Sequence, residues 1–180
     1  MKEELLIVNI QDRILGKGSK TEIHSEKGIL HRAITVFIFN KRSELLITKR
    51  SDKKRLWPNI WESSCSTHVH KGETYEQSGE KRLQQELGFS CPLKFLFKFK
   101  YKAKYKHIGI ENEICGLLFG RYNKEILPNS KEIKDYKWIS INQLKKNIKD
   151  APKNYAPWLK IALEKYLLKK YKNTLIFKFM

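Results

Sequence analysis

The sequence predicts a single α+β domain in which helices flank a mixed β-sheet. Two observations carry most of this prediction. Apolar residues and lysines alternate over residues 92–103, which is the period of a half-buried strand. Residues 158–171 instead place their apolar side chains along one stripe, as an amphipathic helix does. A chain of 180 residues without internal repeats or a low-complexity linker is long enough for one domain with a substantial core.

Strands dominate the first half of the chain. The stretches with the composition of strands are residues 5–10, 33–39, 44–48 and 61–67. Glycines and polar residues at 16–19 and 40–43 predict turns between them. A helix follows over residues 73–87 and ends at Gly88, although Gly79 is unfavourable inside it.

The alternating strand at residues 92–103 has two distinct faces. One face is predicted to carry Leu93, Phe95, Phe97, Phe99 and Tyr101, and the other Lys94, Lys98, Lys100 and Lys102. Its natural hairpin partner is the apolar run at residues 110–119. The remaining elements are a strand at 136–140, helices at 141–148 and 158–171, and a tail at 174–180 that is either an added strand or a frayed end.

The formal charge of +18 at first suggests a nucleic-acid partner. Arginine, the usual reader of base edges, supplies only 7 of the 37 basic residues, and the lysines are spread along the chain. Solvated lysine faces therefore explain the charge better, and no nucleic-acid partner is expected. A basic surface of this kind would also attract a small anionic diphosphate.

Cysteine usage and hydropathy suggest a cytoplasmic protein that does not cross a membrane. Cys65, Cys91 and Cys115 have neither a disulfide framework nor a metal-knuckle spacing, which fits reduced thiols. Apolar runs stay well short of the roughly 18 residues of a membrane span. The first residues, Met-Lys-Glu-Glu, do not resemble a signal peptide.

Two glutamates interrupt the apolar run at residues 108–119. Residues two apart on a strand point to the same face, so Glu111 and Glu113 are neighbours. Two carboxylates in an apolar strand repel each other and lose solvation, and a divalent cation would offset that cost. The alternative is a solvated face on which both are ordinary surface residues.

Histidines elsewhere could complete a metal site with these glutamates. His24 and His31 bracket a short loop that opens onto a strand, and His68 follows another strand-like run. Three imidazoles with two carboxylates form a mixed nitrogen and oxygen set suited to Mn²⁺, Zn²⁺ or Mg²⁺. Spacing alone does not join these positions.

Nine short segments resemble type 1 isopentenyl-diphosphate isomerase, a family of the Nudix superfamily. They are LHRA at 30–33, LLITKR at 45–50, KRLWPNIW at 54–61, CSTH at 65–68, GE at 72–73, ELG at 86–88, YKA at 101–103, ENEIC at 111–115 and APW at 156–158. The resemblance spans about residues 20–158 of a single domain, with a C-terminal helix and tail at 159–180. It implies a Nudix-like mixed sheet flanked by helices, in agreement with the pattern above.

The resemblance also implies the members of an active site. The implied metal ligands are His24, His31, His68, Glu111 and Glu113, and the implied diphosphate contacts are Lys20, Arg50, Lys54 and Arg82. Glu86 would help to hold a second metal, Mg²⁺, on the diphosphate. Tyr101 and Trp158 would lie beside the isoprenoid carbons, and Glu113 would be one of two proton-transfer residues.

The second proton-transfer position departs from the family. The family places a catalytic cysteine two residues before the third metal-binding histidine, and this chain has Ser66 there, preceded by Cys65. On a strand these two side chains face opposite sides, so Cys65 cannot replace Ser66 unless the strand is bulged. Three outcomes stay open: slow isomerisation through Ser66 or a bound water, rescue by Cys65, or loss of isomerase activity.

The resulting functional hypothesis is a metal-dependent isomerase that interconverts isopentenyl diphosphate and dimethylallyl diphosphate, slowed by Ser66. One alternative is a Nudix hydrolase, but the helix at 73–87 has Lys81-Arg82 and Gln85-Glu86 where hydrolases have Arg-Glu and Glu-Glu. The other is a non-catalytic protein that binds isoprenoid diphosphates. The sequence leaves open the native metal, the oligomeric state and whether the substrate has a longer prenyl chain.

Overall fold

The computed structural model describes residues 3–25 and 27–178, with side chains up to residue 169. The strands are β1 (Glu4–Val8), β2 (Ile14–Ser19), β3 (His31–Phe39), β4 (Leu45–Arg50), β5 (Trp61–Glu62), β6 (Cys65–His68), β7 (Lys94–Tyr105), β8 (Gly109–Arg121) and β9 (Ile133–Ile139). The helices are α1 (Lys20–Ile23), α2 (Tyr75–Leu87), α3 (Ile141–Asp150) and α4 (Pro157–Lys178), with a short 3₁₀ turn, η1 (Pro152–Asn154).

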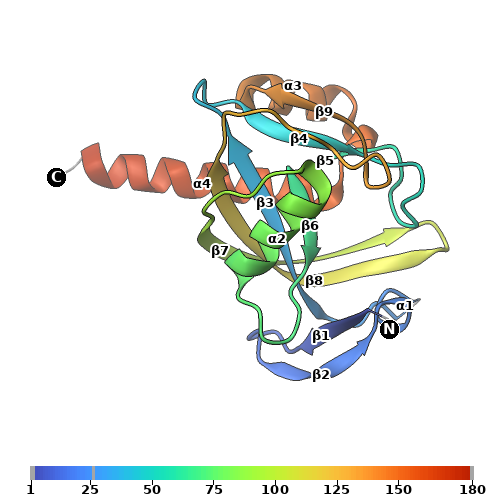
Figure 1. Ribbon diagram of the computed structural model, residues 1–180. Coiled ribbons are helices and arrows are strands. Elements are labelled where there is room, and N and C mark those ends of the chain that lie inside the picture. Colours follow the sequence, from blue (N-terminus) through green and yellow to red (C-terminus); the bar gives the residue numbers. More distant parts are fainter. Residues whose placement is uncertain (1–2, 26, 179–180) are drawn as a thin grey trace.

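One mixed sheet is organised around β3, which pairs with β1, β4, β6 and β8 (Figure 1). β8 runs parallel to β3 over its whole length, and the β1, β4 and β6 neighbours are antiparallel. β7 and β8 form the predicted hairpin, and β9 pairs with β4. The predicted fold class, a mixed sheet flanked by helices, is confirmed.

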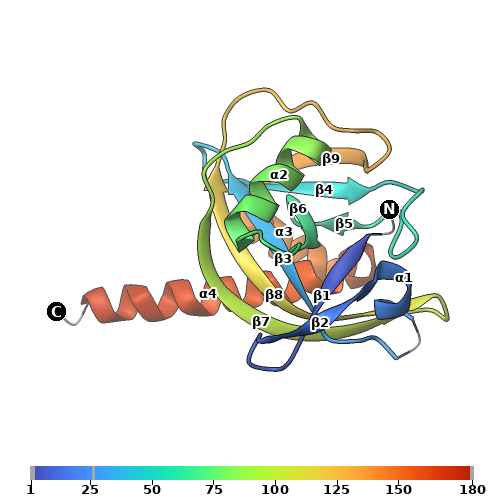
Figure 2. The ribbon, with the colours of Figure 1, turned by 60° about the horizontal axis from the view of Figure 1, so that its bottom comes forward.

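Helices cover the sheet on both faces and create two apolar cores (Figures 1 and 2). Leu83 and Leu87 of α2 pack on one face, where Cys65 is also buried. Leu159 and Leu163 of α4 pack on the other, together with α3. Within the described residues, no helix is both long and apolar enough to span a bilayer.

The predicted turn at residues 16–19 is wrong, because these residues belong to strand β2. Gly16 and Gly18 pair with Ile7 and Leu5 of β1. The two glycines resemble a turn in sequence, and the strand is mostly exposed, so it lacks the apolar alternation that marks a half-buried strand.

A bulge in β7 corrects the predicted single apolar face of that strand. Phe95 pairs with Leu118 and Phe97 with Leu117, so Leu96 is an extra residue. Beyond the bulge, Phe97 packs in the core under α4, whereas Phe95 packs against the α2 core. A one-residue insertion reverses the faces because side chains alternate with a period of two.

Three other predictions are refined. The strand expected at 61–67 is two short strands, β5 and β6, separated by Ser63 and Ser64. Helix α2 contains Gly79 because a β-carbon there would lie 2.6 Å from the side chains of both Leu93 and Leu118. The tail is neither strand nor frayed end as far as Lys178, because α4 continues to that residue, and residues 179–180 lie outside the described residues.

Candidate active site and metal centre

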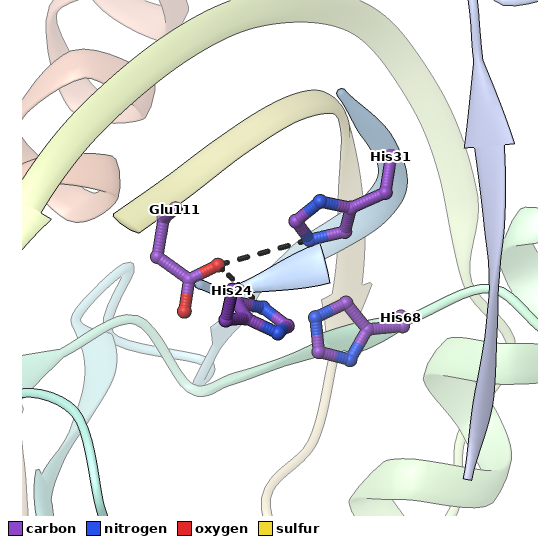
Figure 3. A group of neighbouring side chains, drawn as sticks. All are labelled: His24, His31, His68 and Glu111. Carbon is purple, nitrogen blue, oxygen red and sulfur yellow. Dashed lines mark ion pairs between the residues drawn. The ribbon is translucent and has the colours of Figure 1, made fainter. Parts of the chain in front are cut away.

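Four side chains converge at one end of β3, as Figure 3 shows. They are His24, His31, His68 and Glu111, whose ligand atoms all lie within 4.8 Å of one another. The three imidazole centroids are 4.7 to 5.1 Å apart. Chain segments far apart in sequence therefore form one compact cluster of nitrogen and oxygen donors.

Strand register explains why three of these groups meet. His31 of β3 lies opposite Glu113 of β8, and Ala33, two residues along β3, lies opposite His68 of β6. Glu111 and Glu113 project on the same side of β8, as their spacing predicted, since both approach His31 Nε2, at 3.7 and 3.5 Å.

His24 is positioned by a different element, the short helix α1. Ser19 caps α1 in a reciprocal capping box with Glu22, and buried Ile23 anchors the turn. His24 follows as its C-terminal cap, with Nδ1 2.7 Å from the carbonyl oxygen of Lys20. The Nδ1–H donates to that carbonyl, so Nε2 is left to face the cluster, 2.9 Å from Glu111 Oε2.

The atoms at the centre of the cluster are close neighbours of one another: Glu111 Oε2 forms ion pairs with both His24 Nε2 and His31 Nε2. His24 Nε2, His31 Nε2 and Glu111 Oε2 are buried and have no hydrogen-bond partner among the described residues. His31, like His24, uses Nδ1 to donate to a backbone carbonyl, that of Ile29 at 2.8 Å. Buried polar atoms are almost always hydrogen-bonded, so two imidazole nitrogens and a carboxylate oxygen that face one another without hydrogen bonds fit a ligand that accepts electron pairs, a divalent cation.

Electrostatics at the cluster favour the unprotonated form of two of its three imidazoles, whereas Glu111 raises the pKa of His24 despite its burial. Burial lowers the pKa of His31 to about 4 and that of His68 to about 3. Burial would raise the pKa of Glu111, but His24 lowers it to about 2. Burial and the charge of Glu111 raise the pKa of Glu113 well above its usual range. The two carboxylates thus differ, and Glu113 is the one poised to carry a proton.

A cavity of about 630 Å³ opens beside the cluster. Most of the residues predicted for the active site line it, namely Lys20, His24, Arg50, Lys54, Ser66, His68, Arg82, Tyr101, Glu111, Glu113 and Trp158. His31 and Glu86 are not among the lining residues, and His31 has no exposed side-chain surface. Cys65 does not line the cavity either.

Comparison with known proteins identifies the architecture. Residues 29–160 match the model of the NUDIX domain. The chain is 38% identical over 160 residues to isopentenyl-diphosphate Delta-isomerase 2 of Photorhabdus laumondii, covering 89% of this chain and 90% of that protein. It is 31% identical over 167 residues to isopentenyl-diphosphate Delta-isomerase 1 of Aromatoleum aromaticum, covering 93% and 94%.

The chain belongs to the isopentenyl-diphosphate isomerase family of NUDIX proteins. The solved structure of DR0079 from Deinococcus radiodurans is similar in fold, with a TM-score of 0.75 at 22% identity, and the match covers 91% of this chain and 98% of that one.

At the cationic end of this isomerase-family cavity, the predicted diphosphate contacts are already paired. Lys20 forms a 2.9 Å ion pair with Glu3. Lys54 and Arg82 share the carboxylates of Glu86 and Glu132. Glu132 was missed by the sequence analysis, because nothing in the loop before β9 distinguishes it from a surface glutamate.

Arg50 differs from the other cations because its guanidinium donates to two backbone carbonyls as well as to a carboxylate. It donates to Glu62 Oε1 at 2.7 Å and to the carbonyls of Leu56 and Trp57, at 2.9 Å each. Glu62 also accepts from Trp158 Nε1 at 3.1 Å. Glu62, another residue that sequence reasoning missed, therefore holds Arg50 and Trp158 in place beneath the cavity.

Two aromatic rings, those of Tyr101 and Trp158, line the cavity. The Trp158 ring lies edge to face against Trp57, with centroids 5.4 Å apart, and 6.3 Å from Tyr101. Tyr101 lies opposite Glu113 in the β7–β8 hairpin. The two predicted aromatic groups are therefore brought together next to the carboxylate with the raised pKa.

Ser66 and Cys65 point to opposite sides of β6, as their spacing predicted. Ser66 lines the cavity, and its hydroxyl lies 3.0 Å from Thr35 Oγ1 and 2.9 Å from Ser63 Oγ. Cys65 is fully buried in the α2 core, and burial raises its thiol pKa. The thiol on the cavity side is instead Cys115, two residues after Glu113, which the sequence analysis did not assign.

Proposed function

We propose that the chain interconverts isopentenyl diphosphate and dimethylallyl diphosphate. The observation that carries the proposal is the combination of groups that line one cavity: a histidine–glutamate cluster, two aromatic rings and several cations. An isoprenoid diphosphate has a matching combination of groups, since an apolar branched carbon chain ends in a polyanion. Membership in the isopentenyl-diphosphate isomerase family supports the same substrate.

In this proposal the metal centre consists of His24, His31, His68, Glu111 and Glu113. The donor set suits Mn²⁺, Zn²⁺ or Mg²⁺, and the buried donor atoms without hydrogen bonds are the observation that fits a cation. A divalent cation bound there would stabilise carboxylate charge and lower the pKa of Glu113. The chain itself supplies neutral imidazoles, because burial keeps His31 and His68 unprotonated at neutral pH.

The diphosphate would occupy the cationic end of the cavity. Lys20, Lys54 and Arg82 would bind its oxygens, and Glu86 would hold Mg²⁺ on it. Arg50 contributes to the positive field but is kept in place by Glu62, so its direct contact with substrate is the weakest part of the predicted set. Binding energy gained here, far from the reacting carbons, positions the alkene against Glu113.

Isomerisation requires one proton to be added and another removed. A proton adds to the terminal methylene carbon, the neighbouring carbon becomes cationic, and a proton then leaves the carbon on its other side, which moves the double bond. Glu113 is assigned one of these transfers, with Tyr101 beside it. The Trp158 face would stabilise the cation, and the aromatic rings beside it would exclude water that could trap it.

Ser66 is assigned to the other face of the substrate. An alcohol is far less acidic than a thiol, whose pKa is about 8.5. Ser66 therefore acts by positioning a water or relaying a proton, and turnover is slower than with a thiol. Cys65 does not contribute in this proposal, because its sulfur is buried on the far side of β6.

The test is an isomerisation assay in deuterated water. Purified protein is incubated with isopentenyl diphosphate, Mg²⁺ and Mn²⁺ and followed by NMR, with inorganic phosphate measured in parallel. Dimethylallyl product carrying deuterium is the expected result. Phosphate release without isomerisation would indicate a hydrolase, and tight binding without turnover would indicate a binding protein.

The three free cysteines fit a reducing compartment, and we place the activity in the cytoplasm.

A further inference from the structure

The cationic end of the cavity contains a carboxylate that the proposed reaction does not use, Glu132. Its Oε2 lies 2.9 Å from Arg82 Nη2 and also pairs closely with Lys54 Nζ. Glu86 approaches the same two cations, at 2.5 Å from Arg82 Nη2 and 3.4 Å from Lys54 Nζ. Two carboxylates and two cations thus form a closed, nearly neutral cluster.

The two carboxylates are held very differently. Glu86 lies within α2, and only 4% of its side chain is exposed. Glu132 lies in the loop before β9, and 28% of its side chain is exposed. The backbone of that loop is fixed, since Ser51 N–H donates to the Glu132 carbonyl at 3.0 Å and Asn129 N–H donates to that of Glu86 at 2.8 Å. Displacement of Glu132 by a ligand would therefore involve its partly exposed side chain and not the loop backbone.

Glu132 occupies the position that an anionic oxygen of a ligand would take. It contacts Lys54 and Arg82 from the cavity side, where all three residues are among the lining groups and Glu86 is not. A ligand anion that displaced Glu132 would find the two cations, Lys54 and Arg82, already in place.

We propose that Glu132 is an internal counter-ion that makes diphosphate binding depend on Mg²⁺, so that it determines specificity for metal-complexed diphosphates. The proposal rests on the diphosphate site of the proposed function. An anion without metal must compete with Glu132 for Lys54 and Arg82 and then repels the displaced carboxylate. A diphosphate that brings Mg²⁺ compensates both carboxylates with positive charge, so the competition largely disappears.

The experiment is a calorimetric titration of inorganic pyrophosphate into the wild type, Glu132→Gln and Glu73→Gln, with and without Mg²⁺. Glu73 is the matched control, since it also lines the cavity and pairs with a lysine, Lys81 at 2.9 Å, but contacts neither Lys54 nor Arg82. We expect Glu132→Gln to bind metal-free pyrophosphate about tenfold more tightly, equivalent to about 1.4 kcal/mol. With Mg²⁺ its affinity should stay within about threefold of the wild type, because the metal compensates the charge that the substitution removes.

A second variant, Glu132→Asp, keeps the test informative if Glu132→Gln does not fold. Glu132→Asp keeps the charge but withdraws it by one methylene, so metal-free affinity should lie between those of the wild type and Glu132→Gln. Equal metal-free affinity in folded wild type and Glu132→Gln would overturn the counter-ion role, as would weaker Mg²⁺-pyrophosphate binding by Glu132→Gln, which would make Glu132 a metal ligand. Failure of every variant to bind pyrophosphate under either condition would overturn the diphosphate site itself.

Discussion

The two ends of the cavity differ in which charged groups they contain and in whether those groups are paired. At the metal end, buried electron-pair donors of His24, His31 and Glu111 face one another without hydrogen bonds. At the cationic end, Lys54 and Arg82 are already paired with Glu86 and Glu132. The first end lacks only a cation, whereas the second must exchange a protein anion for a ligand anion. If the proposed sites are correct, we expect metal binding and substrate binding to be separable steps.

The largest expected effect is at the metal end, in Glu113→Gln. Glutamine cannot carry the proton and is a poorer metal ligand, so isomerisation should fall by at least about 10³-fold. Metal retention, measured by elemental analysis after gel filtration, should fall as well. Turnover close to that of the wild type would contradict the assignment of Glu113.

The next largest effect is at the cationic end, in Lys54→Met. This change keeps the apolar stem and removes one charge, so kcat/KM for isopentenyl diphosphate should fall by about 10- to 100-fold, the scale of one charge-assisted contact. Metal content at the histidine cluster should not change. Loss of the cluster metal in Lys54→Met would show that the two ends are not independent.

A smaller effect on the isomerisation rate is expected from Ser66→Cys, at a residue that lines the cavity. Restoring a thiol supplies a far stronger acid, and isomerisation should rise by about tenfold or more. Sulfur is larger than oxygen, and the contacts of Ser66 with Thr35 and Ser63 limit the gain.

A matched change, Cys65→Ala, should lower thermal stability by creating a cavity while leaving kcat nearly unchanged. A strong loss of kcat in Cys65→Ala would contradict the placement of Cys65 outside the reaction.

A further effect, on stability and not on catalysis, distinguishes the two ends by pH. In the metal-free protein, burial lowers the pKa of His31 to about 4 and that of His68 to about 3, below the unfolded value of 6.5. Between pH 6.5 and about 4 the unfolded chain binds more protons, so stability falls as pH falls, by up to about 1.4 kcal/mol per pH unit for each ring. Glu132, whose pKa is lowered by Lys54 and Arg82 despite burial, loses its contribution only below about pH 4.5.

Calorimetric melting across this range checks the difference between the two ends. The wild type should lose stability from pH 6.5 downward, and His31→Gln should lose less of it. A flat profile above pH 4.5 would mean that both rings are already protonated in the folded protein.

Sequence reasoning reached the site where local geometry sufficed and missed what depended on register. The same-face placement of Glu111 and Glu113 follows from the period of a strand. The position of His68 in the site depends on the β3–β6 and β3–β8 registers. Those registers could not be read from the sequence, and only the family resemblance joined His68 to the other ligands. Glu62 and Glu132 were missed because their meaning lies in partners far along the chain.

Departures in the fold have equally local causes. Strand β2 was taken for a turn because Gly16 and Gly18 mimic one, and the β7 bulge at Leu96 adds a residue that an alternation count does not detect. Glycine at position 79 looked unfavourable for a helix until the packing of α2 against Leu93 and Leu118 showed that a larger residue has no room.

Metal stoichiometry measured with and without diphosphate tests the separation of the two ends most directly. Metal-free protein would be titrated with Mn²⁺ in a calorimeter, alone and with saturating inorganic pyrophosphate, and with Glu111→Gln as control. The account predicts one tight site without pyrophosphate, lost in Glu111→Gln, and a second site that forms only when pyrophosphate is present. Absence of any tight Mn²⁺ site before pyrophosphate is added would contradict it.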